Sequence, residues 1–194
     1  FITCLHEMGI VQWEFLYINI YLLLTTSALL GFWGFRLREP LYDSILYFKP
    51  LGAIFYLALG AICMITIGQL LGNANDAGLK IVRDVIIFSH TGYAIIFLTY
   101  IFSNFMVMMA QNLPVYKLLY KPNRMPYFTF QLAGLIATAA FVFYSNWHQY
   151  IFHGTAAFYN YVADLYVLQG KEGLAQQFYD ESRKYAFESH RANY

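Results

Sequence analysis

Residues 50–75 read PLGAIFYLALGAICMITIGQLLGNAN and contain no Asp, Glu, Lys or Arg. A helix needs roughly 20 mainly apolar residues to cross the hydrocarbon core of a bilayer, and this stretch is long enough. The chain has three further long stretches without charge, at 15–35, 85–116 and 125–163. The sequence therefore predicts four membrane-spanning helices, at about 14–35, 50–71, 85–110 and 127–149.

The composition excludes several classes of protein. Of the 194 residues, 59% are hydrophobic and 12% are charged, whereas soluble domains average about 25% charged residues. An ordinary water-soluble globule is therefore excluded. The net charge of +1 gives no support for a nucleic-acid-binding surface, which needs a basic patch or stripe. The apolar stretches do not alternate with a period of two, which disfavours a membrane barrel and favours an all-α fold.

The charges indicate two domains. Nine of the 23 charged residues lie in the last 31 positions. We expect a membrane-embedded helical bundle over residues 1–154 and a water-facing segment over 155–194. Because the chain begins at Phe1 rather than Met, we also expect it to be a piece of a longer protein.

The distribution of Lys and Arg predicts the orientation in the membrane. The connection 36–49 carries Arg36, Arg38 and Lys49, and the connection 111–126 carries Lys117, Lys121 and Arg124. The opposite side receives only Lys80 and Arg83, in the connection 72–84. Cytoplasmic loops carry the excess of Lys and Arg. We therefore expect 36–49 and 111–126 in the cytoplasm of a cell with an inner membrane, and the C-terminal segment on the extracytoplasmic side.

The C-terminal segment is predicted to form two short helices, 157–169 and 172–187, separated by Gly170. Each of these helices has large aromatic and small side chains at defined spacings. The first helix has Tyr159, Val162, Ala163 and Tyr166, and the second has Ala175, Tyr179 and Ser182. In this spacing, residues 156–189 resemble one 34-residue tetratricopeptide repeat (TPR). The segment departs from the family at Phe187, where Pro is usual, and at Ala163, which replaces a Gly.

The resemblance implies a protein-interaction module, because stacked repeats of this family build a concave surface for a partner segment. It implies partner-binding roles for Tyr159, Tyr166 and Tyr179. About three repeats are needed to bury the apolar faces, so it also implies further chain beyond Tyr194. The alternative is a single amphipathic helical hairpin packed on the bundle.

Four of the five histidines fall on the predicted outer side of the membrane: His6, His90, His148 and His153. Ionisable groups at membrane depth are candidates for function. Imidazole and carboxylate ligands together bind zinc, and two imidazoles ligate haem iron. The spacing matches no known metal or haem motif, since His148 and His153 lie five residues apart. The alternative is that these histidines are interfacial or hydrogen-bonded structural residues.

Other polar and small residues in the predicted spans indicate helix packing. We expect five neutral polar residues to join helices: Asn19, Gln69, Asn104, Gln111 and Gln131. Gly52, Gly60 and Gly68 recur every eight residues, and such a stripe lets a neighbouring helix approach closely.

Three functions fit the sequence. The first is a membrane-anchored scaffold that presents the TPR-like module at the extracytoplasmic face and organises an envelope complex. It requires no cofactor, and its partners are the bilayer, a protein and other subunits of a membrane complex. The second is an integral-membrane enzyme or electron-transfer subunit that binds haem b or zinc through His6, His90, His148 or His153. The third, a transporter or channel subunit, fits less well because no span is broken by Gly or Pro. The sequence contains no catalytic motif, so enzyme activity stays open.

Overall fold

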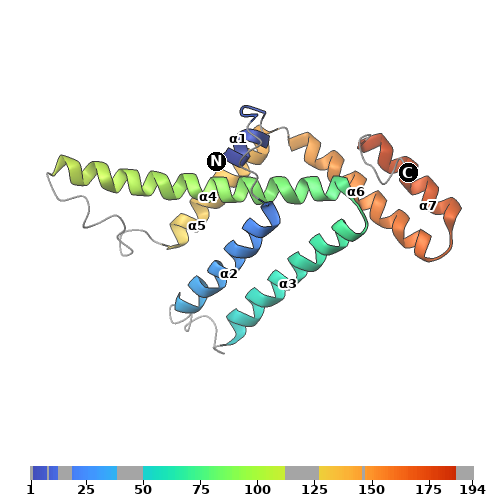
Figure 1. The fold of residues 1–194 in the computed structure, drawn as a ribbon, viewed down its shortest axis with the longest axis horizontal. Coiled ribbons are helices and arrows are strands. Elements are labelled where there is room, and N and C mark those ends of the chain that lie inside the picture. The colour runs from blue at the N-terminus through green and yellow to red at the C-terminus, as the bar shows by residue number, and fades with distance from the viewer. Residues whose placement is uncertain are drawn as a thin grey trace. The chain divides into compact units, whose positions relative to one another are not determined.

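The computed structural model of the chain describes residues 2–7, 9–12, 19–38, 50–111, 127–145 and 147–186. These residues form seven α-helices and no strand, which confirms the all-α prediction (Figure 1). The helices are α1 (Ile2–Glu7), α2 (Ile20–Arg38), α3 (Pro50–Gly72), α4 (Asp76–Ala110), α5 (Tyr127–Tyr144), α6 (Trp147–Leu168) and α7 (Glu172–Tyr185).

The chain divides into two compact units. The first comprises Phe1–Phe15 and Asp84–Trp147, and so contains α1, most of α4 and α5. The second comprises Leu16–Arg83 and His148–Tyr194, and so contains α2, α3, the first two turns of α4, nearly all of α6, and α7.

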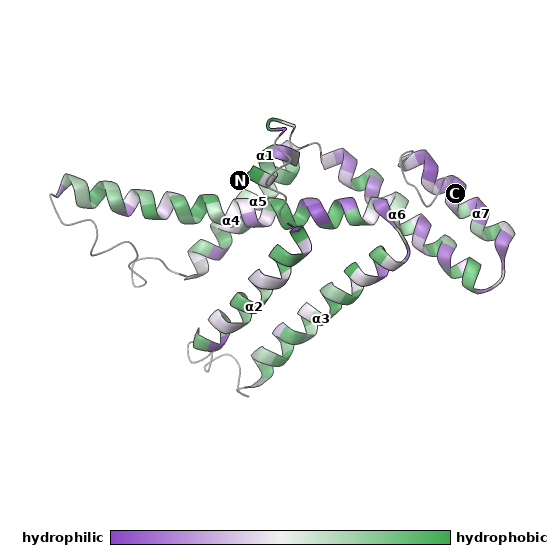
Figure 2. Ribbon diagram, viewed as in Figure 1, coloured by the Kyte–Doolittle hydropathy of each residue, from purple (hydrophilic) through white to green (hydrophobic). Residues whose placement is uncertain are grey.

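Three helices of the described residues are long and apolar enough to cross a membrane, over Ile20–Leu37, Leu51–Gly72 and Asp76–Ala110. They overlap the first three predicted spans, and Figure 2 shows hydrophobic residues along all three. The helix at the fourth predicted span, α5, has an apolar part of only Thr129–Tyr144. Its 18 residues extend about 27 Å at 1.5 Å per residue. The connections 36–49 and 111–126 lie almost entirely outside the described residues.

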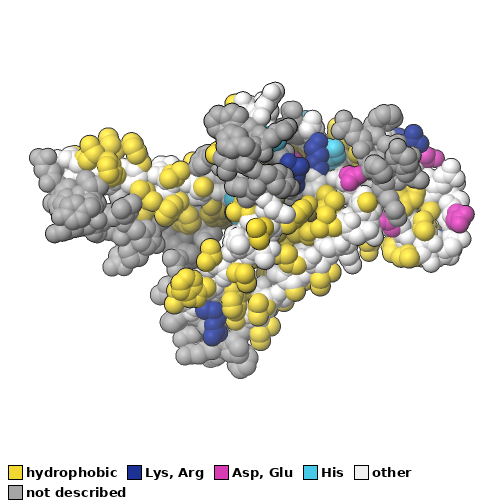
Figure 3. All heavy atoms as spheres, viewed as in Figure 1, with side chains coloured by type: hydrophobic (Ala, Val, Ile, Leu, Met, Phe, Trp, Pro, Cys, Tyr) yellow, Lys and Arg dark blue, Asp and Glu magenta, His cyan; other side chains and the backbone are white. Residues whose placement is uncertain are grey.

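The surfaces of the candidate spans are apolar. On α3 the exposed large hydrophobic residues include Ile54, Leu57, Leu59, Ile62 and Ile65. Figure 3 shows hydrophobic side chains over α2 and α3 on the face toward the viewer. A water-soluble protein rarely exposes apolar patches of this extent, so these surfaces suit contact with lipid.

Helices α2 and α3 contact one another in the second unit. The Tyr56 hydroxyl donates to the carbonyl oxygen of Ala28 at 2.8 Å, and the Tyr56 ring lies 5.6 Å from that of Phe32 between centroids. Helix α2 begins after Asn19, whose Oδ1 accepts hydrogen bonds from the backbone N–H groups of Tyr21 and Leu22. Asn19 is therefore an N-cap rather than a residue that joins two helices.

Helices α4 and α5 approach closely in the first unit, at two glycines. A Cβ atom at Gly92 would lie 2.9 Å from the backbone nitrogen of Thr138, and one at Gly134 would overlap the ring of Tyr93. Phe88 and Phe141 stack nearby with centroids 6.0 Å apart. Two of the three glycines expected to permit close packing behave differently, because a Cβ atom at Gly60 or Gly68 of α3 would meet no atom of the described residues within 4 Å. The third, Gly52, is buried.

Helix α4 begins earlier than the sequence suggested. Only Asn73–Asn75 separate α3 from α4, so Lys80 and Arg83 lie on a helix and not in a connection over 72–84. The cause is local, because Asn75 Oδ1 accepts from the Gly78 N–H at 3.3 Å and caps the helix. Asp76 then stands in the first turn, where the helix dipole favours an acidic residue.

Candidate functional site

The turn between α6 and α7 is built by Gly170. Its φ of 70° is in the left-handed region. The N–H of Gly170 donates to Val167 O, and the N–H of Lys171 donates to Tyr166 O, each at 2.9 Å. This pair of bonds is a Schellman motif, which ends a helix and reverses the chain. Lys171 Nζ lies over the Tyr166 ring, 5.9 Å from its centroid, and so closes the turn.

Small residues bring α6 and α7 together. Ala156 and Ala163 of α6 are fully buried, and so is Ser182 of α7. Ala175 of α7 is 2% exposed. The Ser182 hydroxyl donates to the carbonyl oxygen of Ala156 at 3.1 Å, a backbone approach that a larger side chain would prevent. Ala163, Ala175 and Ser182 are the positions where the sequence pattern predicted small buried residues.

The three tyrosines predicted to bind a partner all contact residues within the α6–α7 pair. The Tyr159 ring stacks with that of Tyr185 at 5.8 Å, and the Tyr166 ring stacks with that of Phe178 at 5.3 Å. The Tyr179 hydroxyl donates to Asp164 Oδ1 at 2.5 Å. Each tyrosine is half-buried, so a part of each side chain stays accessible. Their direct contact with a partner stays a prediction.

The first helix of this pair is longer than expected. It begins at Trp147 rather than Ala157, and the boundary expected at residue 155 falls inside it. The Thr155 hydroxyl bonds to the carbonyl oxygen of Ile151 within the same helix. The sequence predicts a span over 127–149 and a following helix that begins at Ala157. In the structure α5 ends at Tyr144 and α6 starts two residues after Ser145.

A buried polar cluster joins α6 to the α3–α4 turn. Asn75 Nδ2 donates to Ala157 O at 3.0 Å, and Asn160 Nδ2 donates to Asn75 Oδ1 at 3.4 Å. Asn160 is fully buried and Asn75 is 2% exposed. Buried amides that are paired in this way fix the register of the elements they join. Of the neutral polar residues expected to join helices, Asn104 has an Nδ2 with no hydrogen-bond partner among the described residues.

The outer face of α7 is charged. Arg183 pairs with Asp180 and Lys184 pairs with Glu181, each three residues earlier on the helix. Lys184 Nζ donates to Glu181 Oε2 at 2.6 Å, and this hydrogen bond raises the pKa of the ammonium above its ordinary value of 10.5. Figure 2 shows the hydrophilic residues that gather on α7. This face is suited to water or to a polar partner.

The candidate histidines lie on three helices. His6 is exposed on α1, His90 is half-buried on α4, and His148 and His153 lie on the first two turns of α6. The ring nitrogen Nδ1 of His90 lies 2.7 Å from Ile86 O. A carbonyl oxygen only accepts, so Nδ1 is the donor in this hydrogen bond. Within the described ranges, no group of three His, Cys, Asp or Glu side chains is arranged to hold a metal ion.

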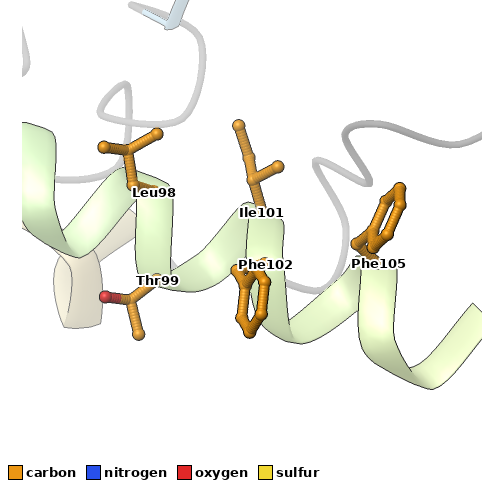
Figure 4. Close-up of a pocket in the computed structure, with 5 residues that line it drawn as sticks. All are labelled: Leu98, Thr99, Ile101, Phe102 and Phe105. Atoms are coloured by element: carbon orange, nitrogen blue, oxygen red, sulfur yellow. The ribbon is translucent and has the colours of Figure 1, made fainter.

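An apolar hollow lies along the later turns of α4. Its lining is Leu98, Thr99, Ile101, Phe102 and Phe105. Figure 4 shows that all five side chains come from this single helix. The polar side chain among these five residues is Thr99, whose hydroxyl already bonds to the carbonyl oxygen of Ile95 at 2.8 Å. The described part of the lining is therefore apolar and suits a lipid chain.

Comparison with known proteins adds no relative. No protein-family model matches the chain, the tetratricopeptide family included, and no match is found among curated proteins or solved structures.

Proposed function

We propose that the chain is a membrane-anchored scaffold whose α6–α7 pair presents a TPR-like protein-interaction module at the extracytoplasmic face. One observation carries the proposal. The small residues at the repeat-like positions Ala163, Ala175 and Ser182 are buried between the two helices. A repeat of this family needs small side chains where its helices meet, and it needs a polar outer surface where partners or water are met.

The extracytoplasmic placement requires a fourth span, and a contact within the second unit supports it. Asn75, just before α4, bonds to Ala157 of α6. Helix α4 is 35 residues long, about 52 Å at 1.5 Å per residue. If α4 crosses the bilayer, the chain after Ala110 must return to the side of Asn75 before it reaches α6. Helix α5 is the segment that makes this return, although its 18 residues require a thin or locally thinned bilayer.

Photo-crosslinking in the membranes of the source organism tests the scaffold function. A photoreactive amino acid replaces Gln177, which is exposed on α7, in the full chain. We expect a discrete crosslinked protein adduct. The adduct should be lost when Ala175→Leu separates α6 from α7, because Ala175 is buried between them.

Two controls define the result. The same reagent at Leu57, on the exposed apolar surface of α3, reports lipid contact and should not give that adduct. Absence of any protein adduct at Gln177 and at the neighbouring exposed Gln176 in folded protein would contradict the scaffold function.

The alternative is an integral-membrane cofactor protein, and it rests on His90. His90 is half-buried on a candidate span, and its Nδ1 is held by a hydrogen bond to a backbone carbonyl oxygen. Histidines that bind metal through one ring nitrogen commonly make such a bond with the other. Purified protein with a Soret band or stoichiometric zinc that is lost in His90→Ala would favour this function over the scaffold.

A further inference from the structure

Helix α6 has an exposed apolar stripe on the side away from α7. Its residues are Ile151, Phe158, Tyr161, Leu165 and Leu168, called the outer stripe below, and each is between 40% and 84% exposed. They recur at intervals of three, four or seven residues, which places them on one face of a helix. Gly154, at the remaining position of the series, lies against Ile81 of α4. The exposed part of the stripe therefore runs from Phe158 to Leu168, over the second half of the 22-residue helix, with Ile151 exposed before Gly154.

The opposite side of α6 is already occupied. Ala156, Asn160 and Ala163 are fully buried. Ala156 accepts the hydrogen bond from Ser182 of α7, and Asn160 bonds to Asn75 before α4. In helical projection these buried positions lie roughly half a turn from the outer stripe. The stripe is thus a second, separate apolar face, which the α6–α7 contact does not use.

The location of α6 is set by the start of α4. Gly78 lies against Ala157, and Gly154 lies against Ile81, so the first two turns of α4 pack on α6. These turns carry charged residues at 76, 80 and 83. Charged side chains at a span end remain in the interfacial layer rather than the hydrocarbon core. If α4 crosses the bilayer, helix α6 lies at the level of the interface, packed against the end of this candidate span.

The chemistry of α6 favours lipid over another protein helix. Its single Asp, Glu, Lys or Arg is Asp164, which is 8% exposed. Paired helices use charged residues beside an apolar seam to set their register, and α6 exposes none. Aromatic side chains such as Phe158 and Tyr161 instead suit the boundary between acyl chains and headgroups. The charged face that an interfacial helix needs is supplied by α7, through residues such as Arg183 and Lys184.

We propose that the outer stripe of α6 lies on the bilayer surface, with its side chains inserted among phospholipid acyl chains and α7 turned to water. This contact does not depend on a protein partner for the α6–α7 pair. It would hold the pair flat on the membrane and leave the charged face of α7 as the surface open to other molecules.

Spin labelling of the full chain in nanodiscs of phosphatidylcholine and phosphatidylglycerol tests this contact. Cys4 and Cys63 are first replaced by Ser, and single labels are attached through Leu165→Cys or Leu168→Cys on the stripe. Gln176→Cys and Gln177→Cys, which are exposed on α7, are the matched controls. Collision rates are measured with oxygen, which concentrates in lipid, and with a water-soluble nickel chelate.

We expect labels at 165 and 168 to collide several-fold more often with oxygen than with nickel, and labels at 176 and 177 to show the reverse. Leu168 is 84% exposed, so its substitution does not disturb packing. Nickel collisions at 168 as frequent as those at 177 would overturn the proposal, since the stripe would then face water. Protection from both reagents, with spin–spin broadening between chains, would also overturn it and assign the stripe to a second copy.

Discussion

The side chain of Asn75 donates a hydrogen bond to the carbonyl oxygen of Ala157, 82 residues later in the chain, with an Nδ2–O distance of 3.0 Å. The same side chain accepts from the Gly78 N–H and from Asn160 Nδ2. One amide therefore begins α4 and also holds α6 to the α3–α4 turn. Both asparagines are almost completely buried, so water cannot replace a lost partner.

Replacement of Asn75 by Ala should destabilise the second unit. The change removes a helix cap and leaves the amide of Asn160 without this acceptor, and together these losses cost roughly 2 kcal/mol. Urea-induced unfolding in detergent micelles measures the change. Asn73→Ala is the matched control, because Asn73 is only half-buried, and it should alter the free energy of unfolding by less than about 0.5 kcal/mol. Equal effects of the two substitutions would show that the buried cluster contributes nothing.

Gly92→Ala should weaken the contact between α4 and α5. The added Cβ atom would stand 2.9 Å from the backbone nitrogen of Thr138, and overpacking against backbone costs about 1–3 kcal/mol. Gly60→Ala is the control, because its Cβ atom meets no atom within 4 Å. That substitution should be neutral or stabilise α3 by up to about 1 kcal/mol through helix propensity. Thermal unfolding of both variants in one detergent compares them, and a lower midpoint for Gly60→Ala would be evidence of a helix packed on α3.

Tyr179→Phe should loosen the α6–α7 pair. Asp164 is 8% exposed and would lose the hydroxyl that donates to its Oδ1. A hydrogen bond to a charged group contributes roughly 2 kcal/mol. Tyr161→Phe removes a hydroxyl from the exposed side of the same helix pair and should change little. Hydrogen exchange at the backbone amides of α7 reports the loosening, and unchanged protection in Tyr179→Phe would argue against a stabilising role for this bond.

The sequence predicted the helices better than their ends. Long uncharged stretches located α2, α3 and the apolar part of α4, because lipid excludes charge from the whole length of a span. Charge content does not mark where a helix begins. The charged residues of 76–84 suggested a connection, whereas Asn75 caps a helix that includes them. The hydrogen bond from the Gly78 N–H to Asn75 Oδ1 marks the start of a helix rather than a connection. The sequence contains an Asn that is able to cap a helix, but it does not show that a helix begins there.

The candidate site was predictable where it depends on neighbours in sequence. The spacing of Ala163, Gly170 and Ala175 predicted two packed helices and their turn, since these contacts join residues close along the chain. The contact of Asn160 with Asn75 spans 85 residues, and no local pattern signals it. The same holds for the approach of Gly134 to Tyr93. The sequence signal for the buried polar contact is Asn160, which lies on the same face of α6 as the small residues Ala156 and Ala163.

His90→Ala distinguishes the two proposed functions. If the protein is a scaffold, the His90 ring has no role beyond its hydrogen bond to the Ile86 carbonyl oxygen. That oxygen is part of the backbone of α4. Removal should then cost no more than about 1 kcal/mol of stability and should leave crosslinking through Gln177 intact. In a cofactor protein, the variant should lose its bound haem or zinc, which an absorption spectrum and metal analysis of purified wild-type and variant protein would detect.

The side of the membrane that holds Lys171 determines whether α5 crosses. If α4 crosses the membrane, as its length and composition allow, the α3–α4 turn and the chain that follows α4 are on opposite sides. The bond between Asn75 and Ala157 ties α6 to that turn. In a chain with Cys4 and Cys63 replaced by Ser, an impermeant maleimide should therefore label Lys171→Cys and Asn73→Cys in intact cells. It should label Lys121→Cys only after permeabilisation. Labelling of Lys171→Cys only after permeabilisation, like Lys121→Cys, while Asn73→Cys is labelled in intact cells, would show that α5 does not cross and that the α6–α7 pair is cytoplasmic.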